Sequence, residues 1–323
     1  MSSGENLMEV IQKARPNAKE STIKMYTSNL NKLKKMFDTD NFDFLKEHEK
    51  VKDKLSDLHF TTQRNYLSAV VIYLMAISKN EKDMKEDPLI LKYASLRDDL
   101  SKIIEDNNAT GIISDKQKES FVDISEVNKM VEEIGEEIKS KKIKKKEDLS
   151  SKDKALLQVY TIFSIYTRLP MRNDLAGMEA INKRTYNKLS EEDKKEKNYL
   201  VVNKNNLFMV LNEFKTNTKY KSINIPIEKD LEKLLRVYLK MNGMGVLFKS
   251  STGKELNRNA LSKLLLKTTK QRMGKSISTT MLRKIYLSSK YGKVQEEQAK
   301  DAEIMGHSVD TQNKVYIKKE QEE

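Results

Sequence analysis

Apolar residues recur at helical spacing through the first third of the chain. In 21–37 and again in 61–78 they return every three or four positions, which places them on one face of a helix. Ser21 is positioned to cap the first of these helices. The second is the more apolar, which favours its burial against the first. With shorter helices expected at 42–48 and 89–104, the pattern predicts an all-helical bundle.

A polar, turn-rich stretch follows this bundle. Residues 106–111 read Asp-Asn-Asn-Ala-Thr-Gly, and the apolar periodicity stays weak as far as Ser120. A new helical stripe starts at Ile124 and leads into the basic run 139–146, which we interpret as a solvated loop. We therefore expect a helical domain, a linker and a second domain, at 1–106, 107–120 and 121–323.

In the second half of the chain, apolar residues recur at helical spacing in some segments and alternate as in a strand in others. A helical pattern at 155–166 is ended by Pro170, because proline cannot continue the helical hydrogen bonds. Alternating segments then predict three strands, at 199–202, 207–214 and 222–227. Helices return at 231–241, 257–273, 280–291 and 294–305, with glycines 243, 274, 292 and 306 in stop positions. The fold class expected is mainly α with a small antiparallel β-sheet, preceded by the all-α domain.

Charge and composition narrow the choice of partner. Lys and Arg number 61 against 48 Asp and Glu, and the net charge of +13 is spread along the chain. This favours a polyanionic partner, although lysines that only solvate helix faces give the same composition. The chain has no cysteine, which excludes disulfides, thiolate metal sites and thiol nucleophiles. No segment has the apolar run of a membrane span, so we expect a soluble, intracellular protein. The high Lys and Asn usage suggests an AT-rich viral or mobile-element genome.

Tyr316 stands out by its neighbours. It lies in a short predicted helix at 310–319, which Ser308 and Asp310 are placed to cap. A tyrosine in such a helix is usually a packing residue. Here, however, Gly306-His307-Ser308 precede it, Arg283 lies on a preceding helix and Arg172 follows a proline-broken turn.

These residues, in this order, resemble the motifs of the tyrosine recombinase (phage integrase) family. The similarity covers about 121–323. Residues 167–175 with Arg172 resemble the family's first arginine box, and 213–216 with Lys215 resemble its lysine motif. Residues 280–283 with Arg283 resemble the second arginine box, and 305–308 with His307 the glycine-histidine box. Tyr316 follows His307 at the separation that the family uses. Each box alone is weak, but the ordered set is specific. The N-terminal bundle resembles the family's core-binding domain in architecture only.

The resemblance implies a site-specific DNA recombinase that cuts and rejoins strands through a covalent 3′-phosphotyrosine. Tyr316 would be the nucleophile, and Arg172, Arg283 and His307 would stabilise the charged transition state. Lys215 would protonate the leaving 5′-hydroxyl, with Lys219 and Lys221 as rivals on the same loop. No metal or other cofactor is implied. The partner would be double-stranded DNA, clamped between the two domains, with a homotetramer on DNA and a monomer in solution.

One position departs from the family pattern. Thr280 stands where the second box usually begins with His or Lys, and a threonine cannot take up a proton at neutral pH. Lys284, next to Arg283, is an auxiliary candidate that also fits a solvated helix lysine. A type IB topoisomerase, a telomere resolvase and a catalytically silent DNA-binding protein of the same fold stay open as alternatives.

The segment after Tyr316 bears on assembly. Family members commonly donate a C-terminal helix to a neighbouring protomer, but 317–323 offer almost no apolar surface after one isoleucine. We therefore expect either a monomer that forms tetramers only on DNA, or exchange of the whole helix that carries Tyr316. The polar segment 308–313 would serve as the hinge for that exchange.

Overall fold

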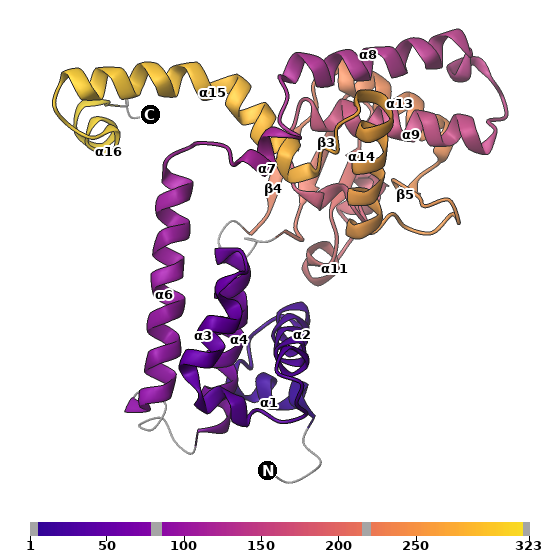
Figure 1. Cartoon of the computed structure of the whole chain (residues 1–323). Helices are drawn as coiled ribbons and strands as arrows, with labels where there is room; N and C mark the ends of the chain where they lie inside the picture. The colour runs from indigo at the N-terminus through magenta and orange to yellow at the C-terminus, as the bar shows by residue number, and fades with distance from the viewer. Residues whose placement is uncertain (1–5, 79–85, 215–220, 319–323) are drawn as a thin grey trace. The chain divides into compact units, whose positions relative to one another are not determined.

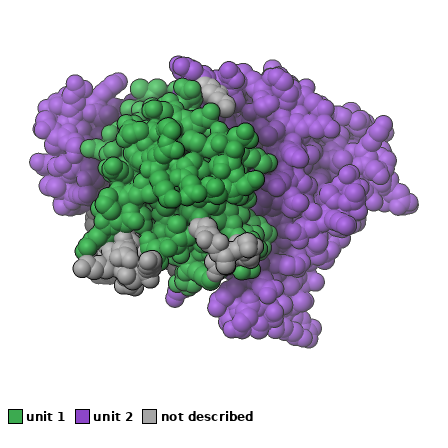
Figure 2. Space-filling view, turned by 60° about the horizontal axis from the view of Figure 1, so that its bottom comes forward, with its two compact units in different colours: residues 1–113 green, residues 114–323 purple. Residues whose placement is uncertain are grey.

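A computed structural model describes residues 6–78, 86–214 and 221–318. The chain divides into two compact units, an N-terminal unit of residues 1–113 and a C-terminal unit of residues 114–323 (Figure 2). Within the described residues, no helix is both long enough and apolar enough to span a membrane.

The described part of the N-terminal unit is helical. Its helices are α1 (Leu7–Ala14), α2 (Glu20–Met36), η1 (Asp43–Lys46), α3 (His48–Ser56), α4 (Phe60–Ile77) and α6 (Pro88–Ala109). The apolar faces of α2 and α4 meet in one core with residues such as Leu30, Leu67 and Tyr93. The Tyr93 hydroxyl, inside this core, donates to the carbonyl of Leu45 at 2.8 Å.

Two helix ends in this unit differ from the sequence expectation. Lys19, and not Ser21, occupies the N-cap position of α2, and its side chain makes no capping bond. At the other end of the unit, α6 continues to Ala109 through residues that were expected to form a turn. Polar residues such as Asn107 weaken a helix without stopping it, and Gly111, with φ +67°, is the first residue here in the left-handed region.

The C-terminal unit combines helices with a small sheet (Figure 1). Its helices are α7 (Asp115–Lys118), α8 (Ile124–Ser140), η2 (Ile143–Lys145), α9 (Ser151–Tyr166), η3 (Asn173–Leu175), α10 (Lys183–Tyr186), α11 (Glu191–Lys195), α13 (Lys229–Asn242), α14 (Arg258–Met273), α15 (Thr279–Ile304), α16 (Val309–Thr311) and η4 (Gln312–Tyr316). Buried residues of α8, α9, α13 and α14 share one core with the sheet. The fold class expected from the sequence is confirmed.

The sheet is mixed, not purely antiparallel as expected. Its strands are β1 (Glu179–Asn182), β2 (Tyr199–Val202), β3 (Leu207–Leu211), β4 (Ile223–Pro226) and β5 (Gly245–Val246), in the order β4-β3-β2-β1-β5. The three predicted strands correspond to β2, β3 and β4, which pair antiparallel. The unpredicted β1 runs parallel to β2, because the crossover between them carries α10 and α11.

One long helix replaces two expected ones. The sequence pattern placed a stop at Gly292, but α15 passes through that position without a break. A glycine inside a helix costs about 1 kcal/mol relative to alanine and ends the helix only where it turns left-handed. Gly243, Gly274 and Gly306 do have positive φ and follow helix ends, so only the stop at Gly292 is wrong.

The predicted last helix is shorter than expected. Ser308 caps it as proposed, since its Oγ accepts the backbone N–H of Thr311 at 3.1 Å. The helix α16 ends at Thr311, and the five residues of η4 that follow form a π-helical turn ending at Tyr316.

Candidate active site

Arg172 and Arg283 line the same hollow of about 380 Å³ in the C-terminal unit. Arg172 immediately precedes η3, and Arg283 lies in the second turn of α15. The rest of the lining is mostly apolar: Leu169, Pro170, Met171, Leu211, Phe214, Ile223 and Ile225, together with Asp174. Two guanidinium groups on one pocket can bind an anion, because both can donate charge-assisted hydrogen bonds to it.

The turn that carries Arg172 is fixed from both sides. The helix α9 ends at Tyr166, whose buried hydroxyl donates to the carbonyl of Arg172 at 2.8 Å. From the other side, Arg283 Nε donates to the carbonyl of Pro170 at 3.3 Å. Among the described residues, neither guanidinium forms an ion pair, so both keep donors for a ligand.

A buried carboxyl lies beside the two arginines. Asp174 is 7% exposed, and burial raises the pKa of its carboxyl. The charges of Arg258, Arg172 and Arg283 oppose that rise, as does a hydrogen bond from the backbone N–H of Arg172. The sequence analysis gave no role to Asp174 or Tyr166. Asp174 lies inside the first arginine box, and Tyr166 was assigned only to the apolar stripe of its helix.

His307 and Tyr316 form a second pair. Their rings stack with centroids 4.9 Å apart and an interplanar angle of 15°. The two ring nitrogens of His307 contact the carbonyl of Ser308 and the sulfur of Met305, each at 3.2 Å. Tyr316 is 60% exposed, so its hydroxyl is accessible to a partner.

The structure does not bring these two pairs together. Arg283 lies near the start of α15, whereas His307 and Tyr316 follow its end. Figure 1 shows α15 as one long helix. Since a helix rises about 1.5 Å per residue, the part of α15 between Arg283 and Ile304 spans roughly 30 Å. The continuous helix through Gly292 is therefore the reason that the predicted residues form two groups.

The other candidate residues do not join either group. Lys215 and Lys219 lie outside the described residues, and Lys221 has a left-handed backbone with φ +54°. Thr280 is exposed in the first turn of α15. Lys284 donates to the side chain of Gln117 at 3.0 Å and is not among the residues that line the hollow.

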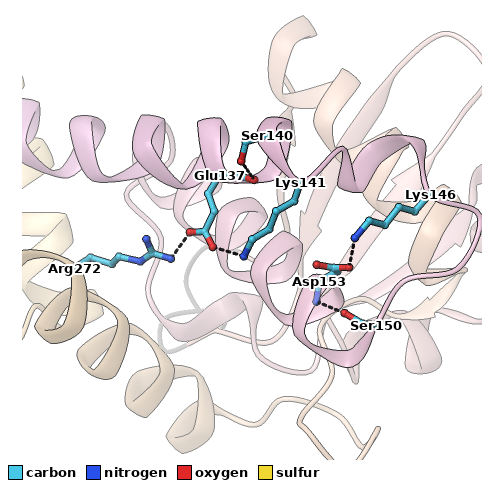
Figure 3. A network of polar contacts seen from close by, with 7 residues as sticks. All are labelled: Glu137, Ser140, Lys141, Lys146, Ser150, Asp153 and Arg272. Carbon is cyan, nitrogen blue, oxygen red and sulfur yellow. Dashed lines mark hydrogen bonds and ion pairs between the residues drawn. The ribbon is translucent and has the colours of Figure 1, made fainter.

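The basic run 139–146 is partly neutralised (Figure 3). Lys141 and Arg272 both contact the Glu137 carboxylate, at 2.6 and 2.7 Å, and Lys146 contacts Asp153 at 2.7 Å. Hydrogen bonds from these cations lower the pKa of both carboxyls. The contacts fix the two ends of the turn and leave the lysines between them facing solvent.

The chain resembles solved structures of recombinases. Comparison with protein-family models and with curated proteins finds no match. A XerH site-specific recombinase bound to a palindromic difH substrate, in a post-cleavage complex, has a TM-score of 0.47 and 18% identity, and the match covers 98% of this chain and 81% of that one. XerA recombinase has a TM-score of 0.35 and 13% identity, and the match covers 97% of this chain and 94% of that one. A pre-cleavage complex of XerH site-specific recombinase with a difH substrate has a TM-score of 0.44 and 17% identity, and the match covers 95% of this chain and 80% of that one.

At these identities and TM-scores, the similarity assigns no role to any residue of this chain.

Proposed function

We propose that this protein cuts and rejoins DNA strands as a site-specific recombinase, through a covalent 3′-phosphotyrosine. The observation that carries the proposal is the arginine hollow, in which two guanidinium groups line one pocket and, among the described residues, neither forms an ion pair. A phosphodiester gathers negative charge on its non-bridging oxygens as it is attacked, and fixed guanidinium groups stabilise that charge without losing a proton.

The reaction exchanges one phosphodiester for another. The Tyr316 oxygen forms a bond to phosphorus, the bond from phosphorus to the 5′-oxygen breaks, and Lys215 gives that oxygen a proton. The phenol proton passes to water, because Thr280 cannot hold it at neutral pH. Rejoining reverses these steps with a 5′-hydroxyl as the attacking group. The bond energy is kept in the phosphotyrosine, so the reaction needs no nucleotide.

The position of Tyr316 supports assembly of the site from two copies of the chain. In the structure, α15 carries His307 and Tyr316 away from the arginines of its own unit, and Val315, Tyr316 and Ile317 are about half exposed. The apolar wall of the arginine hollow suits such residues. We therefore propose that, in a tetramer on DNA, one copy's segment after α15 supplies Tyr316 to the arginines of its neighbour.

A suicide substrate tests the chemistry. Duplex DNA with a nick close to the cut loses the released fragment, so a covalent protein–DNA adduct accumulates and is seen on a denaturing gel. We expect adduct with the wild-type chain and none with Tyr316→Phe, whose DNA binding stays nearly unchanged because only a hydroxyl is lost. An adduct that persists in Tyr316→Phe rules out this nucleophile.

The same assay on different DNA separates the alternatives. Relaxation of supercoiled DNA without exchange of partners indicates a topoisomerase of type IB, and hairpin ends on linear DNA indicate a telomere resolvase. Binding without an adduct in any format indicates a silent DNA-binding protein and contradicts the proposal.

A further inference from the structure

Asn198 joins two segments that border the arginine hollow. It immediately precedes β2 and is 2% exposed. Its side-chain nitrogen donates to the carbonyl of Asp174 at 3.0 Å and to that of Glu213 at 3.1 Å. Its side-chain oxygen accepts the backbone N–H groups of Asn212 and Glu213, each at 2.9 Å. The amide thus makes four hydrogen bonds, which is its full capacity.

A candidate functional residue lies two positions in the sequence from each end of this link. Asp174 lies two residues after Arg172, in the turn that borders the hollow. Glu213 follows β3, and in the sequence Lys215 comes two residues later. The Asn198 side chain therefore fixes the distance between the backbone beside Arg172 and the backbone that leads to Lys215.

The helix α14 makes two further bonds to the same segments. Arg258 donates to the Glu213 carboxylate at 3.0 Å, and Asn173 donates to the Ser262 hydroxyl at 2.9 Å. Arg258 and Ser262 are four residues apart, so they lie on one face of the helix. The Arg258–Glu213 pair is about half exposed and contributes little by itself, whereas the bonds of Asn198 are buried.

We infer that Asn198 is a positioning residue for protonation of the leaving group: it holds the strand end before Lys215 in register with the Arg172 turn. The inference rests on the proposed function. Asn198 contacts no reacting atom in this scheme. Without its two donated bonds, the arginine hollow would keep Tyr166 and Arg283 to fix it, but the strand end at Glu213 would lose its buried connection to Asp174.

The test compares two leaving groups. One suicide substrate has the natural 5′-oxygen at the cut, and the other has a 5′-bridging sulfur, which leaves without a proton. The variant Asn198→Asp keeps the size of the side chain and both accepted bonds, and removes the two donated ones. We expect it to slow cleavage of the oxygen substrate on the order of tenfold to a hundredfold, the effect of a small misplacement, and to slow the sulfur substrate much less.

The ratio of the cleavage rates of the oxygen and sulfur substrates is insensitive to folding defects, because both rates are measured with the same protein preparation. A loss of folded protein lowers both rates equally. Asn242→Ala is the matched control: it removes one amide bond, to the carbonyl of Leu247 at 3.1 Å, away from the arginine hollow, and should leave the ratio at the wild-type value. Should Asn198→Asp fail to fold, Glu213→Ala loosens the same strand end from Arg258 and should shift the ratio in the same direction by a smaller factor.

Equal slowing of both substrates in Asn198→Asp, or no slowing, overturns the inference while leaving the proposed function standing. A wild-type chain that forms no adduct with either substrate overturns both.

Discussion

Arg172 and Arg283 come from distant parts of the sequence, yet both line one hollow. The Tyr166 hydroxyl donates to the carbonyl of Arg172, and the Arg283 guanidinium donates to the carbonyl of Pro170. Among the described residues, no carboxylate forms an ion pair with either arginine side chain. Cations that form no ion pair are typical of anion sites, because a paired cation would first have to break its existing contact.

Replacing either arginine should therefore affect the chemical step more than binding. We expect Arg172→Ala and Arg283→Ala each to slow single-turnover cleavage by on the order of a hundredfold or more, the usual cost of removing a transition-state donor. Quench-flow with saturating suicide substrate measures this rate. Arg168→Ala is a suitable control, since Arg168 lies in the same sequence box, but its guanidinium donates to the carbonyl of Ser164 at 2.9 Å. Wild-type cleavage rates in both Arg172→Ala and Arg283→Ala would contradict the assignment of the site.

Asp174 leads to a prediction about stability and pH. Burial raises the pKa of its carboxyl, against the opposing charges of Arg258, Arg172 and Arg283. A carboxyl whose pKa is higher in the folded state stabilises the fold when protonated. That contribution is full below the unfolded pKa of about 4 and is lost as the pH rises through the folded value.

Asp174→Asn removes the buried charge and keeps the shape. We expect the variant to melt at a higher temperature than wild type at pH 7, with a difference that disappears near pH 4, where the wild-type carboxyl is protonated. Calorimetry at both pH values measures this, with the exposed Asp148→Asn as a control that should change little. A lower melting temperature for Asp174→Asn at pH 7 would mean that the arginines stabilise the carboxylate more than burial destabilises it.

Among the elements, α15 differs most from what the sequence predicts. Apolar periodicity and glycine position indicated a break at Gly292, but periodicity reports which face is buried and says little about where a helix ends. After Ile285, apolar residues of α15 such as Tyr291 and Val294 are about half exposed, so burial of these side chains does not end the helix there. Local helix propensity then decides, and the helix continues.

Helices and strands that are bounded by glycines or polar turns were predictable from the sequence. Strands β2 and β3 are short apolar runs that are mostly buried, and β4 alternates between half-buried and exposed positions. Helices α13 and α14 end at glycines with positive φ. The short strands β1 and β5 were missed because four and two residues are too few for a period to show. The arginine hollow was predictable from motif order, whereas the roles of Tyr166 and Asn198 depend on contacts between distant segments, which a single sequence does not record.

The unbroken helix α15 makes sharing of the site between copies testable. If one copy's Tyr316 acts in its neighbour's arginine hollow, then mixing Tyr316→Phe with Arg172→Ala lets the intact hollow of the first variant meet the intact tyrosine of the second. We expect the mixture to form adduct on a two-site substrate, although each variant alone forms little. Differently sized tags show which chain is attached, and it should be Arg172→Ala. A mixture no more active than its parts would show that each copy uses its own tyrosine.

At the scale of the whole molecule, the charge of +13 would be the main determinant of the proposed association with DNA. Part of that charge is already engaged: Lys141 and Lys146 of the basic run contact Glu137 and Asp153. Such pairs hold their lysines in place on the surface and reduce the charge they offer to a phosphate. Binding should therefore depend on the lysines outside ion pairs, and the number of phosphates neutralised should be much smaller than the number of basic residues.

This leads to a prediction about salt. Each phosphate neutralised releases condensed counterions, so the logarithm of the binding constant falls linearly with the logarithm of salt concentration, with a slope of about 0.9 per phosphate on duplex DNA. With six to ten phosphates contacted, we expect a slope on the order of −5 to −9, and a loss of roughly a thousandfold or more in affinity between 50 and 200 mM salt. Fluorescence anisotropy with a labelled duplex measures this.

Tyr316→Phe should give the same slope as wild type, since it changes no charge. A flat response in both chains would mean that the excess of lysine serves solubility and does not face DNA, which would remove the electrostatic support for a nucleic-acid partner while leaving the arginine hollow unexplained.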